Sequence, residues 1–113
     1  MELAQNNRIN SLLEFYQPLL TSKQQAYMQS YFVADLSLGE ISQNFHVSRQ
    51  AVYDNLRRTV KILSDDEKHL RLYRKFVERN RQIDRIQNYV CRHYANDRQL
   101  KMMIKHLEDL ENN

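Results

Sequence analysis

The sequence has very few residues that break helices or build tight turns. Its 113 residues include one glycine, one proline and one cysteine, and no tryptophan. Architectures rich in β-turns depend on glycine and proline, so this scarcity favours an all-α protein with long helices. A single glycine also excludes the glycine-rich loops with which many nucleotide-binding enzymes surround phosphates.

The cysteine content and the lack of long apolar runs indicate which cellular compartment the protein occupies. One cysteine, Cys91, cannot form an internal disulfide, which favours a reducing compartment. The N-terminal MELAQNNRINSLLEFY lacks the basic start, apolar run and small-residue cleavage site of a signal peptide. No stretch approaches the roughly 18 apolar residues that a membrane span needs. We therefore expect a soluble cytoplasmic protein.

Residue types that perform catalysis or bind metals are scattered along the chain. The four histidines and Cys91 do not have the spacing of a zinc site, and no Ser/His/Asp grouping is apparent. The histidines are His46, His69, His93 and His106. The sequence therefore predicts a protein that is not an enzyme and that needs no metal or other cofactor.

Apolar residues recur at three- and four-residue spacings, as on one face of a helix. A first helix is expected over about residues 2–17, because Pro18 disfavours helical geometry in the residue before it. A second helix should follow a capping box formed by Thr21 and Gln24. The last helix should begin near Asn96.

Residues 36–63, LSLGEISQNFHVSRQAVYDNLRRTVKIL, predict a short helix, a turn and a second helix. Ser37 and Glu40 have capping-box spacing, and Ser48 can cap the second helix. Small Ser42 would let the two helices approach closely. The apolar residues expected between the helices are Ile41, Phe45, Val47, Val52 and Leu56. This pattern is typical of a helix-turn-helix.

The outward face of the second helix carries polar and basic side chains. Arginine and glutamine can read guanine and adenine edges, and a helix N-terminus can hold a phosphate. Asp54 would repel a phosphate unless it pairs with a neighbouring arginine. The candidate nucleic-acid-binding residues are Ser48, Arg49, Gln50, Tyr53, Arg57, Arg58 and Lys61. The alternative is that these residues form an ordinary solvated face on a helical scaffold.

Downstream of this motif, Ser64-Asp65-Asp66-Glu67 has the spacing of a further capping box. It predicts a long helix from there to about Tyr94. We therefore expect two parts, a helix-turn-helix bundle over residues 1–63 and a helical extension over residues 64–113. The extension would pack on the first part or dimerise with it.

The charge of the chain is concentrated in this extension. The whole chain has a formal charge of +3, whereas Lys68–Arg92 has eight basic and two acidic residues, a net +6. The secondary basic residues are Arg71, Arg74, Lys75, Arg79 and Arg85. Three interpretations stay open: a solvated face over an apolar stripe, an arm along a phosphate backbone, and a homodimer or partner interface.

Two segments of the sequence resemble a known family. NNRINSLLEFYQPLLTSKQQAYMQSYF and SLGEISQNFHVSRQAVYDNLRRT are similar to YlxM, a family of small bacterial helix-turn-helix proteins, and SRQAVYDN is the most specific piece. The motif also resembles the promoter-reading fourth region of bacterial sigma factors. It departs from that pattern at His46, where glycine is usual, and at Asn55, where an aliphatic residue is usual.

The resemblance implies a regulatory or accessory role in the signal recognition particle pathway, because YlxM-like genes typically lie beside genes of that pathway. The ligand would be a nucleic acid, either duplex DNA or the particle's RNA. The alternative is a protein-interaction module in which the helix-turn-helix is a scaffold and the basic helix contacts the particle's GTPase.

Overall fold

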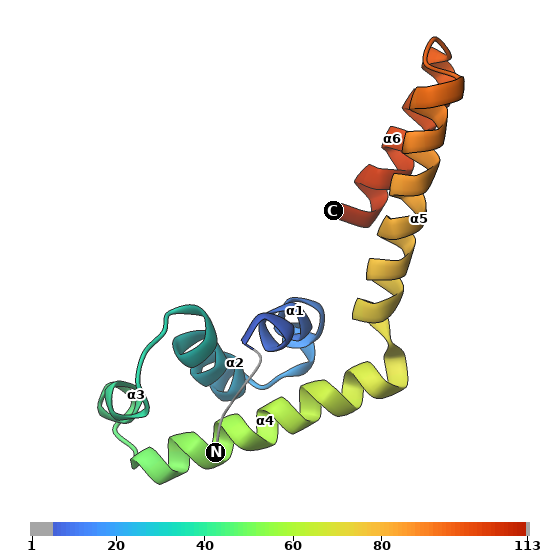
Figure 1. Ribbon diagram of the computed structural model, residues 1–113. Coiled ribbons are helices and arrows are strands. Elements are labelled where there is room, and N and C mark those ends of the chain that lie inside the picture. Colours follow the sequence, from blue (N-terminus) through green and yellow to red (C-terminus); the bar gives the residue numbers. More distant parts are fainter. Residues whose placement is uncertain (1–5, 113) are drawn as a thin grey trace. The chain divides into compact units, whose positions relative to one another are not determined.

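The computed structural model describes residues 6–112, and every element in that range is helical. Six α-helices follow one another in the order labelled in Figure 1. They are α1 (Asn6–Tyr16), α2 (Ser22–Met28), α3 (Leu38–Phe45), α4 (Arg49–Leu70), α5 (Leu72–His93) and α6 (Arg98–Asn112). A 3-10 turn (Gln17–Leu19) follows α1, and a π-helical turn (Gln29–Val33) extends α2. The predicted all-α class is confirmed.

The chain divides into two compact units, Met1–Arg71 and Leu72–Asn113. In the first unit, α1, α2 and α3 each contact α4, which is its longest helix. The core of this unit consists of side chains from all four helices that are almost completely buried. They include Leu12, Leu13, Tyr16, Tyr27, Met28, Ile41, Val52, Leu56 and Leu63.

Local hydrogen bonds begin the helices of the first unit where the sequence predicts. The Thr21 hydroxyl accepts from the Gln24 N–H at 3.1 Å, and the Gln24 side chain accepts from the Thr21 N–H at 2.9 Å. Ser37 and Glu40 form the same reciprocal pair at 3.1 and 3.0 Å. Each pair satisfies two backbone N–H groups that have no partner within the helix. Two of the three predicted capping boxes are therefore confirmed.

The predicted helix start at Ser64 is wrong. Helix α4 runs without interruption from Arg49 to Leu70, so Ser64 lies in its interior. Glu67 does not cap a helix. Its side chain is buried and accepts a hydrogen bond from the Tyr16 hydroxyl at 2.7 Å. A carboxylate that the sequence assigns to a helix terminus thus links α4 to α1.

The predicted single helix from Ser64 to Tyr94 is also wrong. Arg71 adopts a left-handed conformation, with φ 56° and ψ 31°, and its N–H donates to the Glu67 carbonyl at 2.8 Å. This conformation ends α4 because an L-residue there cannot continue a right-handed helix. Helix α5 begins at the next residue.

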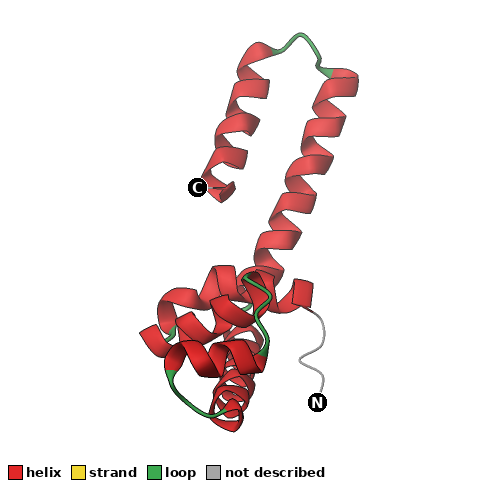
Figure 2. Cartoon of the chain, turned by 90° about the vertical axis from the view of Figure 1, so that its left-hand side faces the viewer, coloured by secondary structure: helices red, strands yellow, loops and turns green. Residues whose placement is uncertain are grey.

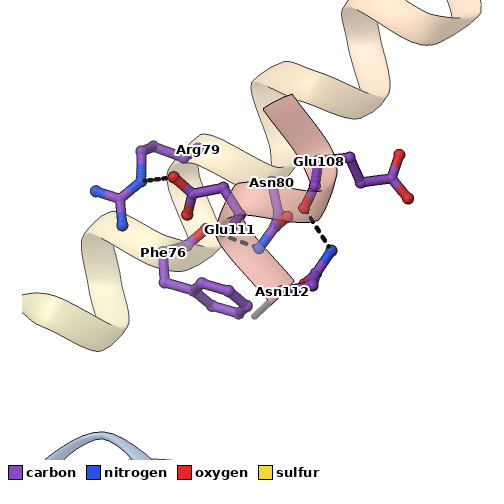
Figure 3. A network of polar contacts seen from close by, with 6 residues as sticks. All are labelled: Phe76, Arg79, Asn80, Glu108, Glu111 and Asn112. Carbon is purple, nitrogen blue, oxygen red and sulfur yellow. Dashed lines mark hydrogen bonds and ion pairs between the residues drawn. The ribbon is translucent and has the colours of Figure 1, made fainter. Parts of the chain in front are cut away.

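The second unit is a hairpin in which α5 and α6 run antiparallel, as Figure 2 shows. Its core is formed by Ile83, Val90 and Ile104, with Leu100 packed against them. Near the end of α6, Arg79 and Glu111 form an ion pair at 2.7 Å (Figure 3). Asp97 caps α6 by accepting from the Leu100 N–H at 3.0 Å. Over residues 6–112, each helix is too short or too polar to cross a lipid bilayer.

Candidate nucleic-acid interface

The candidate interface depends on the angle between α3 and α4. Apolar side chains packed between the two helices maintain this angle. Ile41, Val52 and Leu56 are completely buried between the helices and the rest of the first unit. The Ser42 hydroxyl donates to the Gly39 carbonyl at 2.7 Å. This polar group therefore has a hydrogen-bond partner where the two helices approach closely. These residues pack as the sequence predicts.

Phe45 departs from the predicted packing. Its side chain is 38% exposed, and its ring meets the Tyr27 ring edge-on with centroids 4.9 Å apart. Val47 is half-buried. Phe45 therefore joins α3 to α2 rather than filling the space between α3 and α4.

The turn between the helices depends on His46. This residue has φ 55° and ψ 44°, the left-handed conformation in which glycine is preferred. Its N–H is directed at the Gln43 and Ser42 carbonyls, and the Val47 N–H donates to the Ser42 carbonyl at 3.0 Å. Histidine thus forms the turn with the hydrogen bonds that a glycine would make.

The N-terminus of α4 is capped by Ser48, whose hydroxyl oxygen accepts from the Ala51 N–H at 3.0 Å. The backbone N–H groups of Arg49 and Gln50 lie in the first turn, where the helix offers no acceptor. Such groups, together with the helix dipole, favour a bound phosphate. Ser48 is exposed, so an anion can reach this end of the helix.

Arg49 lies against the start of α3 instead of extending away from the protein. A Cβ atom placed on Gly39 would lie 3.0 to 3.2 Å from the guanidinium atoms of Arg49. The single glycine of the chain therefore leaves room for this side chain. Arg49 remains exposed, and its guanidinium lies beside the start of α3.

The outer face of α4 carries a line of exposed polar and basic side chains. Gln50, Arg57 and Lys61 are spaced so that they lie on one side of the helix, opposite the buried Val52 and Leu56. Arg58 is exposed on the flank of this line, and Tyr53 is half-buried beside it. We refer to Gln50, Arg57 and Lys61 as the α4 line.

Asp54 interrupts the α4 line, but it is engaged with Gln50. The Gln50 amide donates to the Asp54 carboxylate at 2.9 Å. Among the residues that the structure describes, Asp54 makes no ion pair with Arg57 or Arg58. Base reading by Gln50 would require this hydrogen bond to open, whereas Arg57 and Lys61 are already available.

The secondary basic residues do not form one surface. Arg71 lies in the bend after α4 and not on α5. Arg79 turns toward α6 and pairs with Glu111. Lys75 is exposed, on a different side of α5 from Arg74 and Arg85.

Arg74 and Arg85 belong to a line of four arginines, two of which are not among the predicted secondary basic residues. Together with Arg81 and Arg92 they occupy positions separated by seven, four and seven residues, which places all four on one side of α5. This side is opposite the buried Ile83, and all four arginines are exposed. Arg81 also forms an exposed ion pair with Glu78 at 3.3 Å. The spacing alone could have revealed these residues. We refer to them as the α5 arginine line.

Between Asn6 and Asn112, no three histidine, cysteine, aspartate or glutamate side chains are grouped so that they could hold a metal ion. Glu40 is exposed, and its pKa is lowered, first by the hydrogen bond from the Ser37 N–H and second by the Ser37 hydroxyl. That shift has a structural cause, the helix cap, and does not indicate acid–base chemistry.

The capped helices, the buried contacts between them and the left-handed turn define a helix-turn-helix protein. The chain belongs to the UPF0122 family, whose model is described as "Putative helix-turn-helix protein, YlxM / p13 like" and matches residues 3–108. The resemblance to YlxM is thereby confirmed over nearly the whole chain.

Similar proteins carry the same family name. A UPF0122 protein of Limosilactobacillus reuteri (strain DSM 20016) is 59% identical over 111 residues, which cover 98% of each chain. A UPF0122 protein of Lactiplantibacillus plantarum is 57% identical over 98% of this chain and 96% of its own length. A UPF0122 protein of Geobacillus sp. (strain WCH70) is 50% identical over 96% of this chain and 99% of its own length.

Proposed function

We propose that this protein is a nucleic-acid-binding regulatory protein that uses α4 as its recognition helix. The observation that supports this most directly is the α4 line, which stands on the exposed side of a helix locked by buried contacts. In a helix-turn-helix, the exposed side of the second helix enters the major groove and contacts base edges. Arg57 and Lys61 would bind phosphates or guanine edges, and Ser48 would contact a phosphate beside the helix terminus.

The α5 arginine line supports a second, sequence-independent contact. Four arginines on one side of a helix can follow a phosphate backbone, and each contact releases counterions from the nucleic acid. Arginine also binds phosphate through two parallel N–H donors. The α4 line would then position the ligand, and the α5 arginine line would strengthen the complex.

The ligand is either duplex DNA or the RNA of the signal recognition particle. The second candidate rests on the resemblance to YlxM proteins, whose genes typically lie beside those of the signal recognition particle pathway. A regulatory or accessory role in that pathway is therefore part of the proposal. The major groove of duplex RNA is too deep and narrow for a recognition helix, so an RNA ligand would present a loop or a bulge.

The proposal can be tested by fluorescence anisotropy with a labelled DNA duplex and with labelled signal recognition particle RNA. The double variant Arg57→Ala, Lys61→Ala should bind its preferred polymer at least tenfold more weakly, because it loses two phosphate or base contacts. The control is Arg8→Ala, which removes a single exposed charge from α1.

Binding of the double variant with unchanged affinity would show that α4 is not the recognition helix. Failure of the wild-type chain to bind either polymer would favour the alternative in which the helix-turn-helix is a scaffold for a protein contact, such as one with the particle's GTPase. Circular dichroism of each variant checks that the helices are intact.

A further inference from the structure

The α5/α6 hairpin buries little of its own apolar surface. Its core consists of Ile83, Val90 and Ile104, with Leu100 at the edge. Helices of this length gain most of their stability from packing, and small units with so few core residues usually need a further partner. A hairpin with a core of this size gains from additional packing.

Large apolar side chains remain exposed on both helices of the hairpin. On α5, Ile86 is 45% exposed and Tyr89 is 57% exposed. On α6, Met103, Leu107 and Leu110 are 62%, 45% and 77% exposed. The α5 pair is separated by three residues, and the α6 residues by four and three, so each set forms one line along its helix.

The two lines lie on the same face of the hairpin. Ile86 follows the buried Ile83 by three residues, and Leu107 follows the buried Ile104 by three residues. Each line is thus displaced from the shared core by the same rotation about its own helix axis. Helices α5 and α6 run antiparallel (Figure 2). Equal rotations about their axes therefore place both lines on one side of the pair. We call these five residues the apolar face.

The opposite side of the hairpin is mostly polar, although Val77 of α5 is 37% exposed there. A shallow pocket there is lined by Gln87, Asn88, Cys91 and Lys101 above the core residues. Cys91 is exposed and is the only cysteine of the chain. The hairpin is therefore two-sided, and one side has the composition of an interface core.

We infer that a second copy of this chain covers the apolar face, so that two hairpins form an antiparallel four-helix bundle. Helix α6 has 15 residues. Pairing two whole hairpins along this length and across two helices joins surfaces of about 22 by 20 Å. It buries on the order of 1,000 Å² in total, the apolar face and the polar residues around it included. That area reaches the lower limit for a specific interface. A face that packs against its own copy is covered without any other protein.

Charge favours a second copy in a particular arrangement. Helix α5 carries six basic and two acidic residues, a net +4, whereas α6 carries three of each. The three acidic residues of α6 lie in its last turns, where Glu111 pairs with Arg79 of α5 within the chain. A twofold axis along the hairpin places α5 of one copy beside α6 of the other and repeats this attraction. Contact between two α5 helices would instead bring like charges together.

The oligomeric state of the full-length chain tests the inference. Analytical ultracentrifugation at tens of micromolar should give a dimer, and Ile86→Asp or Leu107→Asp should give a monomer with at least tenfold weaker self-association. The matched control is Cys91→Asp, which places the same charge on the opposite side of α5 and should leave the dimer intact. A monomeric wild-type chain would overturn the inference and leave the apolar face to a different protein.

A thiol-labelling experiment maps the face without relying on destabilised variants. In a Cys91→Ser background, Leu107→Cys should be alkylated at least tenfold more slowly at high protein concentration than after dilution. Cys91 of the wild-type chain should react at the same rate under both conditions. Equal, concentration-independent rates at both positions would overturn the inference. Neither experiment involves the α4 line, so its outcome is independent of nucleic-acid binding.

Discussion

At the scale of single residues, the missing Cβ of Gly39 gives room for the side chain of Arg49. Gly39 has no positive φ, so its backbone does not require glycine. The missing Cβ matters because of Arg49, whose guanidinium atoms lie 3.0 to 3.2 Å from where that Cβ would be. A longer side chain at position 39 would therefore displace Arg49 without disturbing the turn of α3.

This gives a prediction for Gly39→Ala. Alanine favours the helix by up to about 1 kcal/mol over glycine, and the end of a flexible arginine can move away at little cost. The free energy of unfolding should stay the same or rise by up to that amount, as measured by urea denaturation. A loss of more than about 1 kcal/mol would mean that Arg49 is fixed more firmly than its exposure implies.

Glu40 gives a prediction on pH dependence. Its pKa is lowered first by the Ser37 N–H, which donates to the carboxylate at 3.0 Å, and second by the Ser37 hydroxyl. A lowered folded-state pKa adds stability above the ordinary glutamate pKa, and that stability is lost as the pH falls through the lowered value. The Ser37→Ala variant should move the Glu40 pKa back toward its ordinary value in an NMR titration. An unchanged pKa would show that the Ser37 hydroxyl contributes nothing to the shift.

At the scale of helices, the sequence predicts the helix starts that depend on neighbouring residues. Thr21, Ser37 and Ser48 all cap helices in the predicted way, because a cap involves residues three positions apart. Ser64 has the same local pattern, but no helix begins there. Glu67 is stabilised instead by Tyr16, which is 51 residues away in the sequence. Local spacing carries no information about such a contact.

The end of α4 could not be predicted for a related reason. Arg71 adopts the left-handed conformation without being glycine or asparagine, and no proline follows it. The hydrogen bond from the Arg71 N–H to the Glu67 carbonyl accompanies this conformation, and the residue type itself does not predict it. The basic residues on the two sides of Arg71 therefore belong to different helices, which the charge pattern alone did not reveal.

The Tyr16–Glu67 contact should contribute measurably to the packing of α1 on α4. Both side chains are buried, and removing one partner of a buried hydrogen bond costs about 1 to 3 kcal/mol. Tyr16→Phe should lower the free energy of unfolding by about that amount. A double-mutant cycle with Glu67→Gln separates this pair from the other contacts of each residue. A coupling energy near zero would show that the pair is not a stabilising link.

At the scale of the whole molecule, the all-α class follows from composition, and the helix-turn-helix follows from the spacing of Ile41, Val52 and Leu56. The candidate surface was only partly predictable. The sequence identified Arg57 and Lys61 as exposed, but Arg79 was included although it pairs with Glu111. Arg81 and Arg92 were left out although their spacing from Arg74 was available.

The α4 line contains two cations and the α5 arginine line contains four, and each line should have its own effect on salt dependence. Removing a cation that contacts a phosphate lowers the slope of log K against log salt concentration by about 0.9 on duplex DNA. Arg81→Ala with Arg85→Ala should therefore lower the slope by almost 2 while leaving sequence preference unchanged. A loss of sequence preference in that variant would mean that α5 reads bases.

The measurement that tests the central claim most directly is the affinity of the Arg57→Ala, Lys61→Ala variant for specific and for unrelated sequences, compared over a series of salt concentrations. If α4 is the recognition helix, this variant should lose most of its preference for the specific sequence, and its salt slope should also fall. If preference and slope are both those of the wild-type chain, α4 does not contact the nucleic acid, and the helix-turn-helix is a scaffold.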